Sequence, residues 1–149
     1  MTSAADTLNV YFHNSLCTIL YCSGGYVRLD WTDADATAAD LGGIYEHTLA
    51  ALKRHRTTKL LTNHALRQPM APQVQQWLAH EWIPRAIREA GYSQCAILES
   101  QKEAGRAAAH AVGDAVFGFF SFKYFNTSAE AHAWLVSQDS VSPSTQTLV

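Results

Sequence analysis

Histidine is the residue type in this sequence with the widest chemical repertoire, because its imidazole binds metals and transfers protons near neutral pH. The chain of 149 residues holds seven histidines and three cysteines. No two histidines stand three or four residues apart on an expected helix, and neither His-Glu-x-x-His nor Cys-x-x-Cys occurs. Zinc sites usually show such spacing. The sequence therefore predicts no metal site and no cofactor.

Two further signatures of catalysis are missing from the sequence. Gly24-Gly25 precedes an expected strand rather than a helix, so its backbone N–H groups would not cradle a phosphate. The Gly-x-Ser-x-Gly motif of serine hydrolases does not occur. We therefore expect a protein without enzymatic activity. The remaining catalytic alternative is an enzyme that uses His64 together with Glu99 for proton transfer.

Polar residues follow two neighbouring strands that we expect to run parallel. Ligands in open α/β sheets favour the crevice at the carboxyl ends of such strands. The residues there that form a predicted ligand or partner surface are Asn63, His64, Arg67, Glu99 and Ser100. The alternative is that these are ordinary loop and capping residues. Ser100 in particular stands three residues before Glu103, which is the spacing of a capping box.

Tryptophan is the other informative residue type, with four copies in the chain. Trp77 and Trp82 share one apolar stripe of an expected helix that Pro84 interrupts, because proline cannot donate a backbone hydrogen bond. Core packing is the default interpretation of such residues. An interface or an apolar pocket is the alternative. We therefore add Trp77 and Trp82 to the predicted ligand or partner surface.

The composition narrows the classes of partner. Eleven basic and thirteen acidic residues give a net charge of −2, whereas nucleic-acid-binding proteins usually carry a basic excess. We expect no nucleic-acid partner. No apolar run is long enough for a transmembrane segment, and no signal peptide is visible at the N-terminus. Three cysteines within apolar segments are typical of buried, reduced thiols in a cytoplasmic protein.

Apolar periodicity predicts three strands followed by alternating helices and strands. The expected strands are Asn9–Asn14, Leu16–Ser23, Tyr26–Trp31, Lys59–Asn63, Gln94–Leu98 and Ala115–Phe125. The expected helices run from Asp35 to His55, from Pro72 to a stop at Gly91, from Ser100 to Val112, and from a capping box at Thr127. Gly113-Asp114 is an expected turn.

This order predicts an α/β fold with a mixed sheet, in which antiparallel N-terminal strands precede parallel strands and about four helices pack on the sheet. We expect residues 1–136 to form a single domain. Residues 137–149 are rich in Ser, Thr and Gln and are predicted to be a disordered tail.

Several short motifs between Tyr21 and Leu135 carry a family resemblance. They are Lys59-Leu60-Leu61-Thr62-Asn63, Gln76-Trp77, Glu81-Trp82-Ile83-Pro84-Arg85-Ala86, Ala90-Gly91, Cys95-Ala96-Ile97, Phe125-Asn126 and Ala131-His132-Ala133-Trp134-Leu135. With the order of elements, these motifs resemble the STAS-like family, the fold of the sporulation anti-sigma-factor antagonists. The similarity is greatest to small bacterial proteins of that superfamily, which is itself compared with the CRAL-TRIO lipid-binding fold.

The resemblance implies a non-enzymatic regulatory module that acts through protein–protein contact, as a homodimer or with another protein. The antagonists carry a phosphorylatable Ser or Thr in the loop after the strand that matches Lys59–Asn63. Here that loop, from Asn63 to Pro69, contains no hydroxyl residue, so no phosphosite is carried over. The alternative function is binding of a small apolar or amphipathic ligand in a pocket lined by aromatic residues, near Trp77, Trp82 or residues 117–122.

Overall fold

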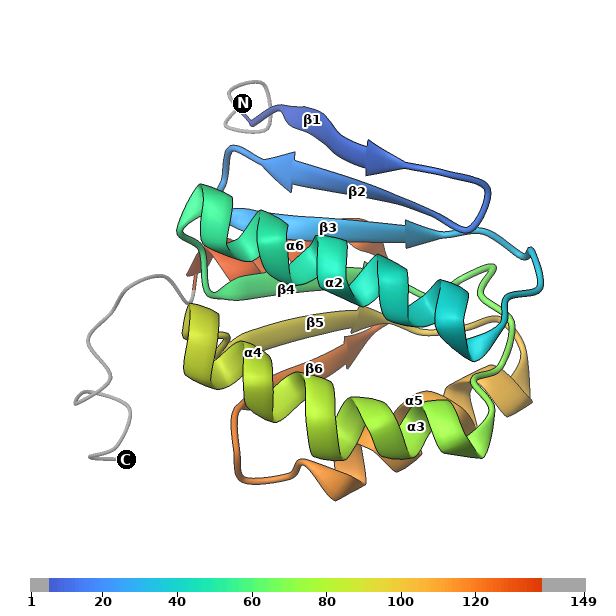
Figure 1. Cartoon of the computed structure of the whole chain (residues 1–149). Helices are drawn as coiled ribbons and strands as arrows, with labels where there is room; N and C mark the ends of the chain where they lie inside the picture. The colour runs from blue at the N-terminus through green and yellow to red at the C-terminus, as the bar shows by residue number, and fades with distance from the viewer. Residues whose placement is uncertain (1–5, 138–149) are drawn as a thin grey trace.

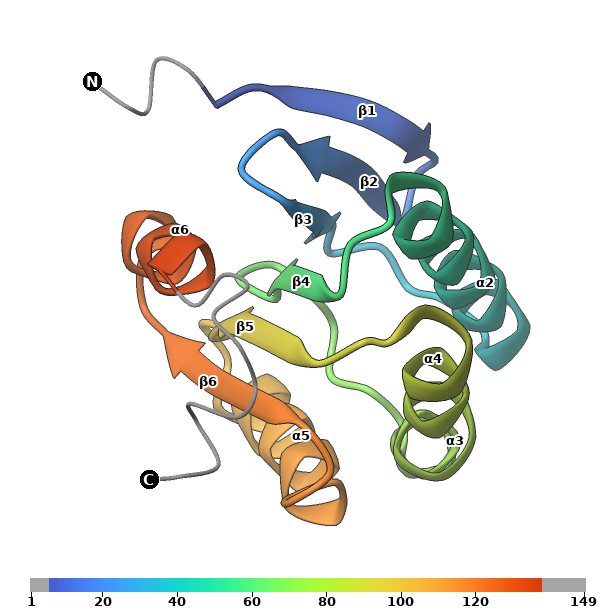
Figure 2. The same ribbon diagram turned by 90° about the vertical axis from the view of Figure 1, so that its left-hand side faces the viewer.

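The structure, a computed structural model that describes residues 6–137, contains one six-stranded sheet with helices on both faces (Figure 1, Figure 2). The strands lie in chain order across the sheet. They are β1 (Leu8–His13), β2 (Cys17–Cys22), β3 (Tyr26–Trp31), β4 (Lys59–Asn63), β5 (Gln94–Leu98) and β6 (Ser121–Phe125). β1, β2 and β3 pair antiparallel, and β3 to β6 pair parallel. The predicted mixed α/β sheet is confirmed.

The helices cover the two faces unequally. They are α2 (Ala38–His55), α3 (Pro72–Trp77), the π-helix η1 (Leu78–Trp82), α4 (Ile83–Ala90), α5 (Glu103–Ala115) and α6 (Ser128–Ser137). Figure 2 shows α6 alone on one side of the sheet, with α2, α3 and α4 on the other. α5 packs against α3 and η1. β4 and β5 are therefore covered on both faces, which explains why nearly all of their residues are buried.

Each face of the sheet has its own core. The larger core lies under α2, η1, α4 and α5 and includes Leu29, Leu52 and Trp82. The smaller core lies under α6 and includes Leu61 and Leu135. Two polar contacts also hold α6: Lys59 Nζ donates to the carbonyl oxygen of Leu135 at 2.7 Å, and the Tyr26 hydroxyl lies 2.7 Å from His132 Nδ1.

The helical segment after Pro72 is interrupted before Pro84, as predicted. The interruption takes the form of a single π turn, in which the N–H of Ile83 reaches the carbonyl oxygen of Leu78. Pro84 cannot donate to His80, and a π turn accommodates the lost α-helical bond. The segment ends at Gly91, as expected, in the left-handed conformation with φ of 71°.

Two predicted boundaries around α5 are wrong. The helix continues through the expected turn at Gly113-Asp114, and β6 begins at Ser121 rather than Ala115. A side chain at position 113 would crowd the rings of Phe122 and Tyr124, so Gly113 permits a close helix–sheet approach instead of a turn. Ser100 is also not the N-cap residue, because α5 begins at Glu103.

The observed ends of α2 and α6 lie closer to the predicted ones. α2 begins at Ala38 rather than Asp35, because Thr37 and Asp40 form a capping box. Ser137, the first residue of the predicted tail, is the last residue of α6, and the rest of that tail lies outside the described residues. Within residues 6–137, no helix combines the length and apolar character needed to cross a bilayer.

Candidate ligand-binding site

Arg67 is a buried cation in the loop that follows β4. Its side chain is only 5% exposed. Nη1 donates to the Tyr45 hydroxyl at 3.1 Å and lies 3.2 Å from His64 Nε2. Cζ lies 3.7 Å from the ring centroid of Trp31, which is cation–π geometry. Trp31, Tyr45, His64 and Arg67 are called the Arg67 cluster below.

Three elements bring the Arg67 cluster together. Tyr45 lies on the buried stripe of α2, and Trp31 ends β3. The backbone N–H of His64 donates to the carbonyl oxygen of Leu98, so the loop after β4 stays attached to β5. The N–H of Arg67 then donates to the carbonyl oxygen of His64, and this turn directs both side chains toward α2. The Trp31 indole is fixed at 3.0 Å from Thr62 Oγ1.

The charge of Arg67 is not neutralised within the part of the chain that the structure describes. No carboxylate oxygen among residues 6–137 lies within 4.0 Å of its guanidinium. Its Nη2 atom is buried and has no hydrogen-bond partner among those residues. Buried charges in proteins are almost always paired, and buried donors are almost always bonded. An unpaired guanidinium is therefore a candidate binding group.

Burial fixes the protonation of the two partners of Arg67. The pKa of His64 falls well below 6.5, first because burial disfavours the charged imidazolium and second because Arg67 repels it. His64 is thus neutral at pH 7, and its Nε2 accepts from Arg67. Burial raises the pKa of Tyr45, although Arg67 opposes the shift. Tyr45 therefore keeps its proton, and its hydroxyl oxygen accepts from Nη1 while its O–H remains able to donate.

A cavity of about 70 Å³ adjoins the Arg67 cluster. Tyr45, His64 and Arg67 are part of its lining, and most of the other lining residues, such as Leu78 and Val112, are aliphatic or aromatic. Its aromatic lining consists of Tyr45, Trp82, Tyr92, Phe120, Phe122 and Tyr124. One water needs roughly 10–15 Å³ and a benzene-binding cavity measures about 150 Å³. A volume between these values suits a group of a few carbon atoms.

Arg67 also lines a second hollow of about 270 Å³. Trp31 and Gln68 contribute to its wall, together with Leu41 of α2 and Val74 of α3. Pro69 and Gln73, which also line it, are exposed residues, so this hollow lies near the surface. Arg67 thus borders both the apolar cavity and a more polar hollow.

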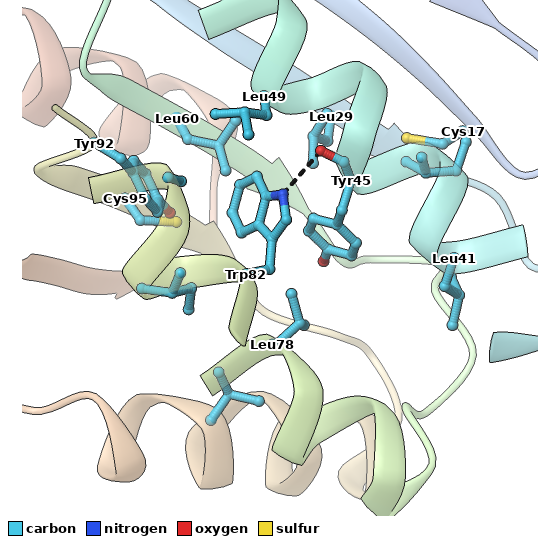
Figure 3. Packing of buried hydrophobic residues seen from close by; sticks show 14 of the residues in the cluster. Cys17, Leu29, Leu41, Tyr45, Leu49, Leu60, Leu78, Trp82, Tyr92 and Cys95 are labelled. Carbon is cyan, nitrogen blue, oxygen red and sulfur yellow. Dashed lines mark hydrogen bonds between the residues drawn. The ribbon is translucent and has the colours of Figure 1, made fainter. Parts of the chain in front are cut away.

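Trp82 belongs to the core and to the cavity wall. It is 2% exposed, and its indole N–H donates to the carbonyl oxygen of Tyr45 at 2.9 Å (Figure 3). The two rings lie 4.9 Å apart between centroids. Trp77 is half-buried and meets the Tyr45 ring edge-on at 6.0 Å. Both tryptophans therefore position Tyr45, and Trp82 is inaccessible to a protein partner.

The predicted polar surface splits between the two faces of the sheet. Asn63, Glu99 and Ser100 line a third hollow of about 610 Å³, whose lining does not include His64 or Arg67. Successive residues of an extended chain point to opposite faces, so Asn63 and His64 separate where β4 ends. Of the residues predicted to converge, the Arg67 cluster contains only His64 and Arg67.

Asn63, Ser100 and Glu99, which line this third hollow, are bonded to other residues of the protein. Asn63 Nδ2 donates to Asp30 Oδ1 at 3.0 Å, and Ser100 Oγ accepts from the N–H of Lys102 at 3.0 Å. Glu99 pairs with His110 at 3.0 Å. His64 is bonded to Arg67 instead, so the pair of His64 and Glu99 expected for an enzyme does not form.

Sequence reasoning missed Tyr45, Trp31 and Thr62 as members of the site. Tyr45 and Trp31 are both buried aromatic residues. The polar atom of each ring could have indicated a role in the site, because a buried Tyr hydroxyl or Trp N–H usually needs a hydrogen-bond partner. The identity of those partners, Arg67 and Thr62, depends on contacts distant in sequence.

The described part of the chain contains no group of three or more His, Cys, Asp or Glu residues that would hold a metal ion. Comparison of the chain with protein-family models, with curated proteins and with solved structures found no match in any of the three.

Proposed function

We propose that the protein is a non-enzymatic binding module that takes up a small amphipathic ligand. The apolar part of the ligand occupies the cavity of about 70 Å³, and its polar end contacts the Arg67 cluster. The observation that carries this proposal is the cavity itself, whose lining is mostly aromatic and aliphatic and includes Tyr45, His64 and Arg67 of the Arg67 cluster. Small-molecule sites typically have this construction.

The side chains that line the cavity are suited to binding a ligand rather than to catalysing its conversion. Burial raises the pKa of the Cys95 thiol to about 12, so this lining residue is protonated and a poor nucleophile at pH 7. His64 is neutral, and its Nε2 accepts from Arg67. The STAS-like resemblance also implies a module without catalysis, but one that acts through protein–protein contact.

The proposal is tested by titration with 1-butanol, followed through the indole ¹H–¹⁵N signals. Trp82 lines the cavity and Trp31 contacts both Thr62 and Arg67, whereas Trp134 is a residue of α6 and packs against Phe125. Saturable shifts of the Trp82 and Trp31 signals are expected, with the Trp134 signal unchanged. Single Trp→Phe variants assign the signals.

A matched pair of variants on α5 controls for binding elsewhere. Ala109 lines the cavity, whereas Ala107 is exposed on the same helix. Ala109→Leu places three further carbon atoms in the cavity and should abolish the saturable shifts. Ala107→Leu should leave them unchanged. Absence of the Trp82 shift in the wild-type protein, or full binding by folded Ala109→Leu, would refute the proposed function.

A second candidate function is self-association, which the exposed turn before β6 favours. Phe117 and Phe119 are 80% and 65% exposed on either side of Gly118, whose φ is 94°. Large exposed aromatic side chains close together are typical of protein interfaces. The proposed homodimer buries these two residues against a second copy of the chain.

Sedimentation equilibrium tests this second candidate. The wild-type protein should dimerise with rising concentration, and the double variant Phe117→Ser, Phe119→Ser should remain monomeric. The exposed Leu66, changed to Ser, serves as the control and should not alter the association. A wild-type monomer at every concentration would exclude the homodimer.

A further inference from the structure

We propose that the ligand is a short aliphatic monocarboxylate, whose carboxylate binds Arg67 and whose chain fills the adjoining cavity. This inference rests on the proposed function, to which it adds the chemical class of the ligand. It starts from the unpaired Nη2 atom of Arg67 rather than from the shape of the cavity.

The hydrogen-bond inventory of Arg67 indicates where an anion would bind. The two N–H groups of Nη1 are directed to the Tyr45 hydroxyl and to His64 Nε2. Nη2 carries two more N–H groups and has no partner among residues 6–137. The Tyr45 hydroxyl oxygen accepts from Nη1, and its O–H is a third donor. One carboxylate oxygen on Nη2 and the other on the Tyr45 hydroxyl would satisfy two of these three donors.

The charge of the site points to a monoanion. Among the described residues, Arg67 is the only lysine or arginine in the lining of the cavity, and burial keeps the lining His64 neutral. One cation balances one negative charge, whereas a phosphate monoester carries close to two at pH 7. Charge-assisted hydrogen bonds between guanidinium and carboxylate are among the strongest that proteins form. A carboxylate therefore fits better than a phosphate.

The size and lining of the cavity specify the rest of the molecule. Its volume of about 70 Å³ is roughly half that of a benzene-binding cavity, so a short alkyl chain fits better than an aromatic ring. Leu78, Ile83 and Val112 are among its apolar walls. Butanoate, with three carbon atoms beyond its carboxylate, is therefore a suitable probe.

The test compares butanoate with 1-butanol at pH 7, using the Trp31 and Trp82 indole signals. Both probes place an alkyl chain in the cavity, but only butanoate carries a charge. The wild-type protein should bind butanoate roughly tenfold or more tightly than 1-butanol, as one charge-assisted bond to Arg67 implies. Arg67→Met should lose this preference and keep its affinity for 1-butanol.

Two further variants keep the test decisive. Arg106→Met removes a cation from the third hollow and should bind both probes as the wild type does. Tyr45→Phe removes the hydroxyl group, which accepts from Arg67 Nη1 and supplies the proposed donor to the second carboxylate oxygen, and should weaken butanoate binding severalfold without affecting 1-butanol. If Arg67→Met does not fold, Tyr45→Phe and the comparison of the two probes in the wild type still give an answer.

The outcomes separate this inference from the proposed function. If 1-butanol binds and butanoate binds no more tightly, the carboxylate assignment is wrong and the amphipathic site stands. If butanoate binding survives Arg67→Met but is lost in Arg106→Met, the anion occupies the third hollow and the inference is also wrong. If neither probe shifts the Trp82 signal, the proposed function fails as well.

Discussion

The guanidinium of Arg67 lies on the indole ring of Trp31, with Cζ 3.7 Å from the ring centroid. The Trp31 N–H is itself bonded to Thr62, so the ring that supports Arg67 is held in one orientation. A desolvated cation–π contact contributes about 2 kcal/mol, which is less than the cost of burying an unpaired charge. The contact therefore positions Arg67 without replacing a counterion.

Replacement of Arg67 by Met should have little effect on stability. The change removes an unpaired buried charge, which favours the variant, and leaves Tyr45 and His64 without their donor, which disfavours it. We expect the free energy of unfolding to stay within about 1 kcal/mol of the wild-type value. Urea unfolding followed by circular dichroism measures the difference. A loss above about 3 kcal/mol would show that Arg67 is a structural residue with its charge compensated.

The stability of the protein should fall in mild acid because of His64. Its pKa in the folded state lies well below 6.5, owing first to burial and second to Arg67. Below pH 6.5 the unfolded chain binds a proton at this residue that the folded protein does not. Stability is thus lost as the pH falls, by at most about 1.4 kcal/mol per pH unit, and His64 contributes nothing to the pH dependence above pH 7.

The variant His64→Gln isolates this effect, because Gln retains an acceptor for Arg67. Urea unfolding of both proteins between pH 7.5 and 5 gives the difference in unfolding free energy. As the pH falls from 7.5 to 5, we expect the variant to become more stable relative to the wild type, by about 1–2 kcal/mol over the range. Parallel curves for the two proteins would contradict the neutral state of His64 in the fold.

Two glycines within helices should respond to alanine in opposite directions. A Cβ at Gly43 of α2 meets no atom within 4 Å, so Gly43→Ala should stabilise the protein by about 0.5–1 kcal/mol through helix propensity. A Cβ at Gly113 of α5 would collide with the Tyr124 hydroxyl and the Phe122 ring. Gly113→Ala should therefore destabilise the protein. Thermal unfolding of both variants checks this, and stabilisation by both would contradict the close packing of α5.

The buried thiols should be inert in the folded protein. Burial raises the pKa values of Cys17 and Cys95 to about 12, so almost no thiolate is present at pH 8. All three cysteines, Cys22 included, are buried and free. We expect an aromatic disulfide reagent to label none of them in native buffer and all of them in denaturant. Rapid labelling of native Cys95 would indicate that the cavity opens readily to solvent.

The sequence was sufficient to predict the central strands and the class of fold. β4 and β5 are short segments with adjacent apolar residues, Leu60-Leu61 and Cys95–Leu98, and such segments form buried strands when helices cover both faces. Gly113 shows where local reasoning fails. Gly-Asp is a common turn dipeptide, and only the proximity of Phe122 and Tyr124 reveals that the glycine serves helix packing.

The candidate site was only partly predictable for a similar reason. Sequence position places His64 and Arg67 after a parallel strand, where ligands often bind. A polar loop of this kind is normally solvated, and nothing local to residues 63–69 indicates that Arg67 is buried. Its burial depends on Trp31 and Tyr45, which lie 36 and 22 residues earlier in the chain. Pairing of elements this distant is a property of the whole fold.

A crystal structure of the protein with butanoate would show whether Arg67 binds the carboxylate of a ligand held in the cavity. We expect a carboxylate within about 2.7–3.0 Å of Arg67 Nη2 and of the Tyr45 hydroxyl, with the alkyl chain directed toward Trp82. If butanoate binds elsewhere, or if a carboxylate of the protein itself neutralises Arg67, then Arg67 is not the binding group.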